Sequence, residues 1–151
     1  MDVKNAFLHG DLAEEVHMLP PPGYDHPPNK VCRLRWALYG LKQAPRAWFS
    51  KFSTTICSFG FTSSSYDHAL FIHRTINGSI LVLLYVDDMI ITGDDVAGIH
   101  KLKTFLNQHF EMKDLGHLSY FLGLKVSSNS SGYCLTQTKK YWYIFCEGEE
   151  I

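Results

Sequence analysis

Two adjacent aspartates, Asp87 and Asp88, are the residues of this sequence best suited by type and position to do chemistry. The apolar run at residues 80–86 precedes them and a second, at residues 89–92, follows them, so they are predicted to lie in a turn between two buried strands. A buried carboxylate is costly unless it is paired or bound to metal, and two unit charges ~4 Å apart repel by about 4 kcal/mol at an effective dielectric near 20. A divalent cation would hold the pair together; a solvated Asp-Asp turn is the alternative.

Charged side chains divide the middle of the sequence into a basic and an acidic segment. No acidic residue occurs between Asp25 and Asp67, whereas residues 67–95 hold five aspartates against one base, Arg74. A basic face beside an acidic centre suits a polyanionic ligand together with a metal ion, although an ordinary solvated surface would show the same basic run. The bases of the first segment are Lys30, Arg33, Arg35, Lys42, Arg46 and Lys51.

Composition limits the class of protein. Hydrophobic residues make up 46% of the 151 residues, which is typical of a folded domain rather than a disordered chain. The longest apolar run, residues 80–86, is far shorter than the roughly 18 residues that a membrane span needs, and no leader-like segment opens the sequence. The four cysteines include no C-x-x-C pair, which disfavours zinc and disulfide frameworks. We expect one globular unit that is intracellular, cytoplasmic or nuclear, neither secreted nor membrane-bound.

Two segments have helical periodicity. Residues 44–59 carry large apolar side chains at intervals of three or four, with a proline near the start and a glycine just after the end, a pattern typical of a helix with one buried face. A second helix is predicted to begin at a cap formed by Asp94 or Asp95 and to run to Phe110.

Strands are predicted on both sides of the first helix. Residues 15–19 and 31–36 have strand periodicity, the second with its arginines on one face, and the proline-rich residues 20–28 between them form a loop. Residues 69–74 and 79–86 flank Asn77-Gly78, a strong hairpin signal, and the second of these strands is apolar on both faces and therefore central.

Later strands are predicted at residues 118–126 and 133–136, around a turn at residues 127–132. Helices interleaved with mostly antiparallel strands predict an α+β fold with the helices packed on one face of the sheet.

Five segments of the sequence form an ordered set. They are residues 2–8 (D-V-K-N-A-F-L), 38–48 (L-Y-G-L-K-Q-A-P-R-A-W), 85–88 (Y-V-D-D), 114–116 (D-L-G) and 121–124 (F-L-G-L). In order and spacing they resemble the palm motifs of the reverse transcriptases of copia-type (Ty1/copia) long-terminal-repeat retrotransposons, the third segment being similar to the Y-x-D-D motif. The resemblance covers roughly residues 2–139.

The resemblance implies an RNA-directed DNA polymerase with a palm-like antiparallel sheet. It also implies two-metal phosphoryl transfer, in which Asp2, Asp87 and Asp88 hold two Mg²⁺ ions that activate the primer 3′-hydroxyl and stabilise the leaving pyrophosphate. The implied partners are an RNA or DNA template-primer and deoxynucleoside triphosphates, and the sequence points to no protein partner.

Further site residues follow from the same resemblance. Phe7 would be an aromatic gate that excludes a ribose 2′-hydroxyl, with core packing as the alternative, and Gly40 and Tyr85 would lie beside the nucleotide. For the segment at residues 121–123 the resemblance implies contact with the primer strand, with packing or a bulge as the alternative. The implied nucleic-acid contacts are Lys42, Gln43, Pro45, Arg46, Phe121 and Gly123.

The sequence departs from the family pattern at both ends. Met1 directly precedes Asp2, so the fingers and most of the strand that carries this aspartate are missing from the sequence, and so short a terminal strand is expected to fray. After Lys139 the family-like pattern gives way to Y-W-Y-I-F and an acidic end. We expect a partial palm domain over residues 1–139, a divergent tail over residues 140–151, and a truncated fragment that is inactive alone.

Three alternatives stay open. A catalytically dead nucleic-acid-binding remnant would use the basic segment. A cyclase with the same palm would use two metals without a template, although the segment at residues 40–48, which positions a template in the family, argues against it. An unfolded translation product is the third.

Overall fold

The computed structural model describes residues 1–129 and 132–137 of the chain. It divides into two compact units, Met1–Asp114 and Leu115–Ile151, where one globular unit was expected. The expected boundary between residues 139 and 140 lies outside the described residues and stays a prediction. No helix in the described part of the chain is both long and apolar enough to cross a bilayer.

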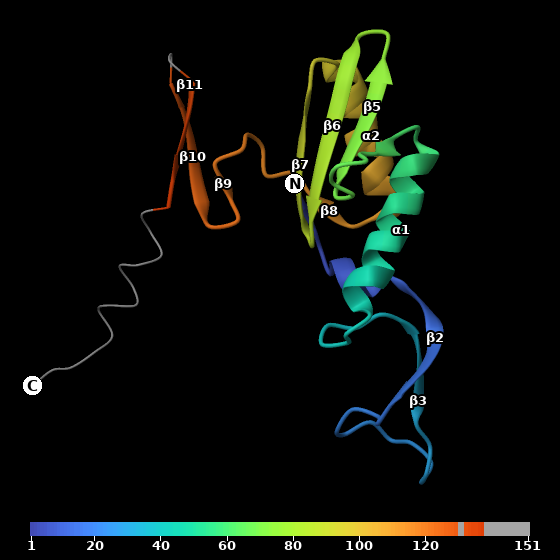
Figure 1. The fold of residues 1–151 in the computed structure, drawn as a ribbon. Coiled ribbons are helices and arrows are strands. Elements are labelled where there is room, and N and C mark those ends of the chain that lie inside the picture. Colours follow the sequence, from blue (N-terminus) through green and yellow to red (C-terminus); the bar gives the residue numbers. More distant parts are fainter. Residues whose placement is uncertain (130–131, 138–151) are drawn as a thin grey trace, which may run out of the picture. The chain divides into compact units, whose positions relative to one another are not determined.

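An antiparallel sheet of six strands forms the centre of the first unit (Figure 1). Its order is β4-β5-β6-β7-β1-β8, and the apolar strand β6 lies in its interior, as predicted. The strands are β1 (Asp2–Val3), β4 (Thr62–Ser63), β5 (Leu70–Thr75), β6 (Gly78–Tyr85), β7 (Asp88–Gly93) and β8 (Met112–Lys113).

The β5–β6 hairpin is confirmed, but its turn lies one residue earlier than predicted. Thr75 pairs with Gly78, so the turn residues are Ile76 and Asn77. Gly78 begins the strand with a φ of 140°, and a Cβ there would lie 2.7 Å from the Cβ of Asp94. Glycine is therefore needed at this position for its conformation and for the close approach of Asp94, not as a turn residue.

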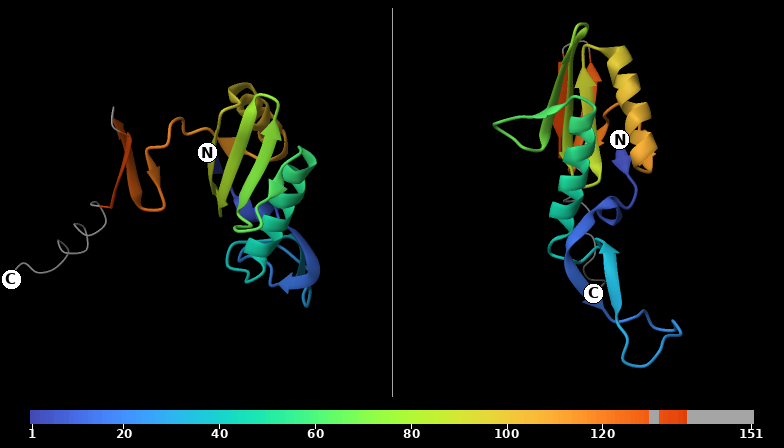
Figure 2. Two further views of the ribbon diagram at one scale, coloured as in Figure 1. Left: turned by 45° about the horizontal axis from the view of Figure 1, so that its top comes forward. Right: turned by 90° about the vertical axis from the view of Figure 1, so that its right-hand side faces the viewer.

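Both predicted helices form, and both pack on one face of the sheet (Figures 1 and 2). They are α1 (Ala44–Ser58) and α2 (Val96–His109), and the rings of Phe59 and Phe105 meet between them with centroids 4.6 Å apart. The predicted cap of α2 is Asp95, whose Oδ1 accepts a hydrogen bond of 2.8 Å from the Gly98 N–H. The α+β fold with helices on one face is thus confirmed.

The hydrophobic core lies between this face and the helices. Alternate residues of β6 are buried and the residues between them are only partly buried, so the core side of the sheet is defined by strand periodicity. The buried core side chains include Val3, Trp48, Phe52, Ile56, Phe71, Ile80, Val82, Leu84, Met89, Leu102, Leu106 and Phe110. Trp48 belongs to this core and lies on the buried face of α1 together with Phe52 and Ile56.

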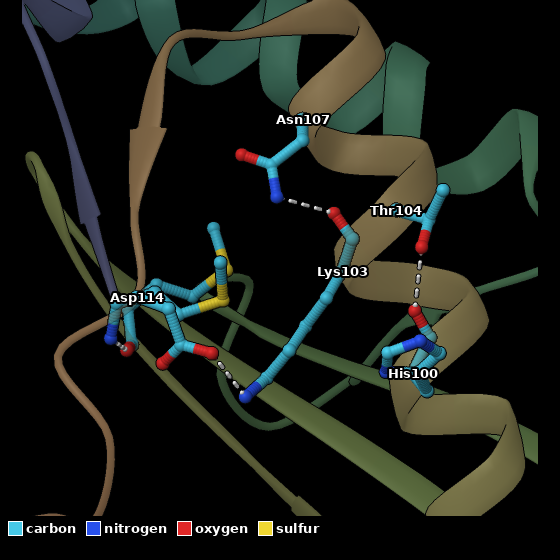
Figure 3. Close-up of polar contacts among 7 residues, drawn as sticks. His100, Lys103, Thr104, Asn107 and Asp114 are labelled. Carbon is cyan, nitrogen blue, oxygen red and sulfur yellow. Dashed lines mark hydrogen bonds and ion pairs between the residues drawn. The ribbon is translucent and has the colours of Figure 1, made fainter.

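An ion pair joins α2 to the chain that follows β8. The Lys103 ammonium lies 2.7 Å from Oδ2 of Asp114, and Figure 3 shows the lysine extending from the helix to that carboxylate. On the same helix, Thr104 and Asn107 donate hydrogen bonds to the carbonyls of His100 and Lys103. The ion pair therefore joins the end of the first unit to its second helix, while the two hydrogen bonds lie within that helix.

A two-stranded hairpin and a short 3₁₀ helix complete the first unit. The elements are η1 (Ala6–His9), β2 (Asp11–Met18) and β3 (Cys32–Trp36), with β2 antiparallel to β3. The proline-rich residues 20–28 contain no helix or strand, as predicted. Between η1 and β2, Gly10 is buried against α1, where a Cβ would lie 2.7 Å from the Trp48 backbone nitrogen.

The second unit contains three antiparallel strands in the order β11-β10-β9, namely β9 (Tyr120–Phe121), β10 (Leu124–Asn129) and β11 (Gly132–Thr136). The prediction of one strand over residues 118–126 is wrong, because Leu122 and Gly123 form a two-residue turn, with Phe121 opposite Leu124. Their φ values are 51° and 83°, the signs that a tight primed turn needs. The predicted turn at residues 127–132 is also too long, since β10 continues to Asn129.

Candidate active site

Four polar side chains form a row across the sheet, on the face away from the helices. Tyr85 pairs with Asp88, Asp88 with Asp2, and Asp2 with Lys113. Directly opposite residues of antiparallel strands share a face, with Cβ atoms about 4.5–5.5 Å apart. The preceding pair, Leu84 and Met89, is buried on the helix side. Two aspartates far apart in the sequence therefore lie side by side.

Asp87 lies in the turn that joins β6 to β7, whereas Asp88 is the first residue of β7. The sequence placed both aspartates in the turn. Both carbonyl groups around Asp87 are held: the Asp87 carbonyl accepts a hydrogen bond of 2.8 Å from the Val3 N–H, and the Val86 carbonyl accepts one of 2.7 Å from Nε1 of Trp48. Strand β1 and helix α1 thus fix the backbone at this aspartate.

Strand β1, which carries Asp2, is paired on both sides. Asp2 lies opposite Asp88 of β7 and opposite Lys113 of β8, and the following residue, Val3, is 1% exposed. Hydrogen bonds to both neighbours and a buried side chain hold this short strand in the sheet, and they oppose the expected fraying, which stays a prediction.

Burial and neighbouring negative charge both disfavour the ionised form of Asp88. Partial burial raises the pKa of its carboxyl, and the negative charges of Asp87 and Asp2 raise the pKa further. Carboxylate oxygens are the ligands that Mg²⁺ and other hard divalent cations prefer, so the donors fit such a metal. Within residues 1–129 and 132–137, however, no group of three or more His, Cys, Asp or Glu side chains is arranged as a metal site. The carboxylates of Asp2, Asp87 and Asp88 are therefore neighbours, but they are not arranged around a single point.

The residues expected near a nucleotide lie at different places in the first unit. Phe7 in η1 is partly buried, packs against the core and contacts the ring of Tyr39, with centroids 4.7 Å apart. Gly40 has a φ of 91°, and a Cβ there would contact nothing within 4 Å. Its backbone conformation alone therefore accounts for glycine. Tyr85 is 53% exposed at the end of the row. The predicted roles of these three residues stay predictions.

The expected nucleic-acid contacts of the first unit gather at the start of α1. Lys42, Pro45 and Arg46 are exposed there, and Gln43 is the residue before the helix, where its side chain caps no backbone N–H. Gln43 and Arg46 also line an open cavity of about 350 Å³. The rest of its lining is Asp11, Leu12, Ala13, Glu14, Ala47 and Ser50, so none of the three predicted metal ligands contributes to it.

The remaining predicted contacts, Phe121 and Gly123, belong to the second unit. Phe121 ends β9, and Gly123 is the second residue of the β9–β10 turn. A Cβ on Gly123 would meet no atom within 4 Å, so its positive φ explains the glycine. The alternative of a bulge is replaced by a turn, and a role at the primer strand stays a prediction.

Two residues of the site were missed from the sequence. Lys113 completes the row of side chains, and only the pairing of β1 with β8 reveals it. Trp48 is part of the second family-like segment, but its hydrogen bond to Val86 joins residues that the chain separates widely. No periodicity or spacing signals either contact.

The sheet, with helices on one face and aspartates on the other, is consistent with part of a polymerase palm. The family model described as "Reverse transcriptase (RNA-dependent DNA polymerase)" matches residues 1–145. The chain therefore belongs to the reverse transcriptase family, in the form found in copia-type retrotransposon polyproteins.

Relatives in plants and yeast agree. The chain is 43% identical over 141 residues, 92% of its length, to "Retrovirus-related Pol polyprotein from transposon RE1" of Arabidopsis thaliana. It is 46% identical over 129 residues, 83% of its length, to that from transposon TNT 1-94 of Nicotiana tabacum. A putative transposon Ty5-1 protein of Saccharomyces cerevisiae is 34% identical over 134 residues, covering 87% of this chain and 44% of the yeast protein. The chain spans about 10% of each plant polyprotein. No solved structure matches it.

Proposed function

We propose that this chain supplies the carboxylate centre of an RNA-directed DNA polymerase, which adds deoxynucleotides to a primer paired with a template. The observation that carries the proposal is the pairing of Asp2 with Asp88 on the open face of the sheet, next to Asp87. The proposed substrates are deoxynucleoside triphosphates and a template-primer of RNA or DNA. Such an enzyme acts inside the cell, so an intracellular location, cytoplasmic or nuclear, is part of the proposal.

In this proposal Asp2, Asp87 and Asp88 hold two Mg²⁺ ions. Bound divalent cations would lower the pKa of the primer 3′-hydroxyl and neutralise charge on the leaving pyrophosphate. The protein's own contribution is to keep Asp2 and Asp88 side by side on the sheet, with Asp87 in the adjoining turn. Partial burial, together with the negative charges of Asp87 and Asp2, raises the pKa of Asp88. Both causes disfavour its ionised form, and a bound divalent cation would offset them, which supports the proposal.

Nucleotide and nucleic acid would be contacted by side chains around this centre. Tyr85 is next to Asp88 and exposed, so it can reach a ligand on the open face. Phe7 is proposed to exclude a ribose 2′-hydroxyl, and the exposed bases at the start of α1 to contact phosphates. The proposed set is Phe7, Gly40 and Tyr85 for the nucleotide, and Lys42, Gln43, Pro45, Arg46, Phe121 and Gly123 for the template-primer.

Metal binding tests the carboxylate centre directly. Titration of the chain with Mn²⁺, followed by the electron paramagnetic resonance signal of the free ion, is expected to show binding that Asp88→Asn weakens at least tenfold. The matched control is Asp25→Asn, because Asp25 is exposed in the proline-rich loop. Equal Mn²⁺ affinity of wild type and Asp88→Asn would contradict the proposal.

Primer extension on an RNA template, with Mg²⁺ and deoxynucleotides, separates membership of the family from activity of this chain. We expect no extension by the wild-type chain alone. Extension by the wild type that is absent in Asp87→Asn would overturn that expectation and show that the chain is a working polymerase by itself.

A second candidate function is nucleic-acid binding without chemistry. Among the ion pairs of the described residues, Lys51 of the basic segment pairs with Asp11 at 2.7 Å, but Arg33, Arg35 and Arg46 have no carboxylate partner. Exposed, unpaired arginines suit phosphate contacts. Salt-dependent RNA binding that survives Asp88→Asn, in a chain that binds no Mn²⁺, would favour this candidate.

A further inference from the structure

The turn that carries Asp87 depends on a contact from outside the sheet. Nε1 of Trp48 donates a hydrogen bond of 2.7 Å to the Val86 carbonyl, the carbonyl of the peptide group that leads directly into Asp87. Trp48 is 1% exposed in the first half of α1. In Figure 1 the β6–β7 turn and the start of α1 lie at the same end of the first unit.

Val86 needs such a contact because its backbone is strained. Its φ is 53°, in the left-handed region that β-branched residues rarely adopt. Residues held in such conformations persist where their surroundings restrain them, and they gather at functional sites. Val86 is also 39% exposed, so packing of its own side chain provides little restraint.

The backbone at Asp87 is restrained from two directions. The Trp48 indole holds the carbonyl before this residue, and the Val3 N–H holds the carbonyl after it at 2.8 Å. The peptide planes on both sides of Asp87 are therefore restrained, and with them the direction of the Cα–Cβ bond that carries its carboxylate. Removal of either donor would free one of these planes.

We propose that Trp48 is a positioning residue of the metal site: its indole N–H holds the strained turn so that the Asp87 carboxylate can bind a divalent cation together with Asp88. This inference rests on the proposed function, because it assumes that Asp87 is a metal ligand. It goes further by assigning a role to a buried residue that touches neither metal nor substrate.

The test removes the indole N–H while keeping the shape of the ring. In 3-benzothienylalanine a sulfur atom replaces the N–H, so this residue at position 48 fills the same space but donates no hydrogen bond. We expect the Mn²⁺ affinity of the chain with this residue at position 48 to fall roughly tenfold or more, as is typical when a partner that orients a metal ligand is lost. The matched control places the same residue at Trp36, which is 60% exposed, and should leave Mn²⁺ affinity unchanged.

A rescue experiment separates positioning from core packing. Glycine adopts positive φ without steric cost, so Val86→Gly relieves the strain that the indole restrains. In the chain with benzothienylalanine at position 48, Val86→Gly is expected to recover part of the Mn²⁺ affinity. Failure to recover any would assign the loss to altered packing and overturn the proposal.

Two further outcomes distinguish this inference from the proposed function. In the first outcome, the chain with benzothienylalanine at position 48 binds Mn²⁺ as tightly as wild type, whereas Asp87→Asn does not bind it. This result would overturn the role of Trp48 and leave the carboxylate centre intact. In the second outcome, wild type binds Mn²⁺ no more tightly than Asp87→Asn does. This result would overturn both the role of Trp48 and the proposed carboxylate centre.

Discussion

Replacing Gly10 with alanine tests how closely α1 packs against the chain between η1 and β2. Gly10 has a φ of −74° and a ψ of 125°, an extended conformation that alanine adopts without strain. An alanine Cβ would, however, lie 2.7 Å from the backbone nitrogen of Trp48 and 2.9 Å from the carbonyl carbon of Ala47. The backbone conformation permits the substitution, while the neighbouring helix opposes it.

The two effects differ in size. Alanine in place of glycine at a compatible conformation stabilises a protein by about 0.4–1 kcal/mol, because the unfolded chain loses freedom. Overpacking a buried site costs about 1–3 kcal/mol, and the upper part of that range applies here because the atoms in the way are helix backbone, which cannot rotate aside. We expect Gly10→Ala to lower the free energy of unfolding by about 1–2 kcal/mol, or Tm by roughly 4–8 °C for a unit of this size.

Thermal unfolding followed by circular dichroism measures this difference, and urea titration gives the free energy independently. The control is Ala13→Val, which adds more atoms on the neighbouring strand, where the side chain is exposed. A surface change of this kind should alter Tm by no more than about 2 °C. A Gly10→Ala protein as stable as wild type, or more stable, would refute the close approach of α1 to Gly10.

Three other substitutions have expected outcomes. Phe52 is fully buried, so Phe52→Ala should cost about 3–5 kcal/mol in urea unfolding, whereas Tyr66→Ala, at a fully exposed ring, should have no measurable effect; equal effects would contradict the core described above. Hydrogen bonds from a threonine hydroxyl and a backbone N–H lower the pKa of Asp95, so its stabilisation is present above the unfolded carboxyl pKa of about 3.9 and is lost as pH falls through the folded pKa. Asp95→Asn should therefore have a lower free energy of unfolding than wild type at neutral pH, and the difference should become smaller in acid. A difference that does not depend on pH would contradict a stabilising role for the ionised Asp95 carboxylate. The pKa of Asp88 is raised, so its contribution to stability depends on pH in the opposite direction. That contribution is present below the unfolded pKa and is lost as pH rises through the folded pKa. Asp88→Asn should thus raise Tm at neutral pH without metal, and a lower Tm would show that the ionised Asp88 carboxylate does not destabilise the folded chain.

Local patterns predicted most elements of the fold. The spacing of apolar residues gave both helices, Asp95 was a recognisable cap, and the apolar run of β6 indicated a central strand. Errors occurred where conformation at a single residue decides the structure. Leu122 and Gly123 interrupt an apolar stretch that has the composition of one strand, and their positive φ values leave no trace in periodicity.

The candidate site was less accessible to prediction than the fold. Asp87 and Asp88 were evident from their flanking strands, but Asp2 entered only through family resemblance, and its neighbour Lys113 did not enter at all. Both depend on which strands pair and in which register, and those are tertiary properties. The same reason explains why the Trp48 contact with the aspartate turn could not be foreseen.

The pairing of β1 between β7 and β8 also has a consequence for the order in which the protein folds. The β5–β6–β7 meander and the two helices rely on partners close in sequence, so they can form early, whereas β1 must wait for Asp88 and Lys113, which lie most of a unit further along the chain. Contacts of such long sequence separation form slowly, because the chain entropy of a large loop must be lost first. On the ribosome, Asp2 is made before its partners and can join the sheet only once Asp88 has left the exit tunnel, and its second neighbour, Lys113, follows later still. The row of polar side chains across the sheet is therefore completed late in folding, and a folding intermediate without β1 would lack the pairing of Asp2 with Asp88.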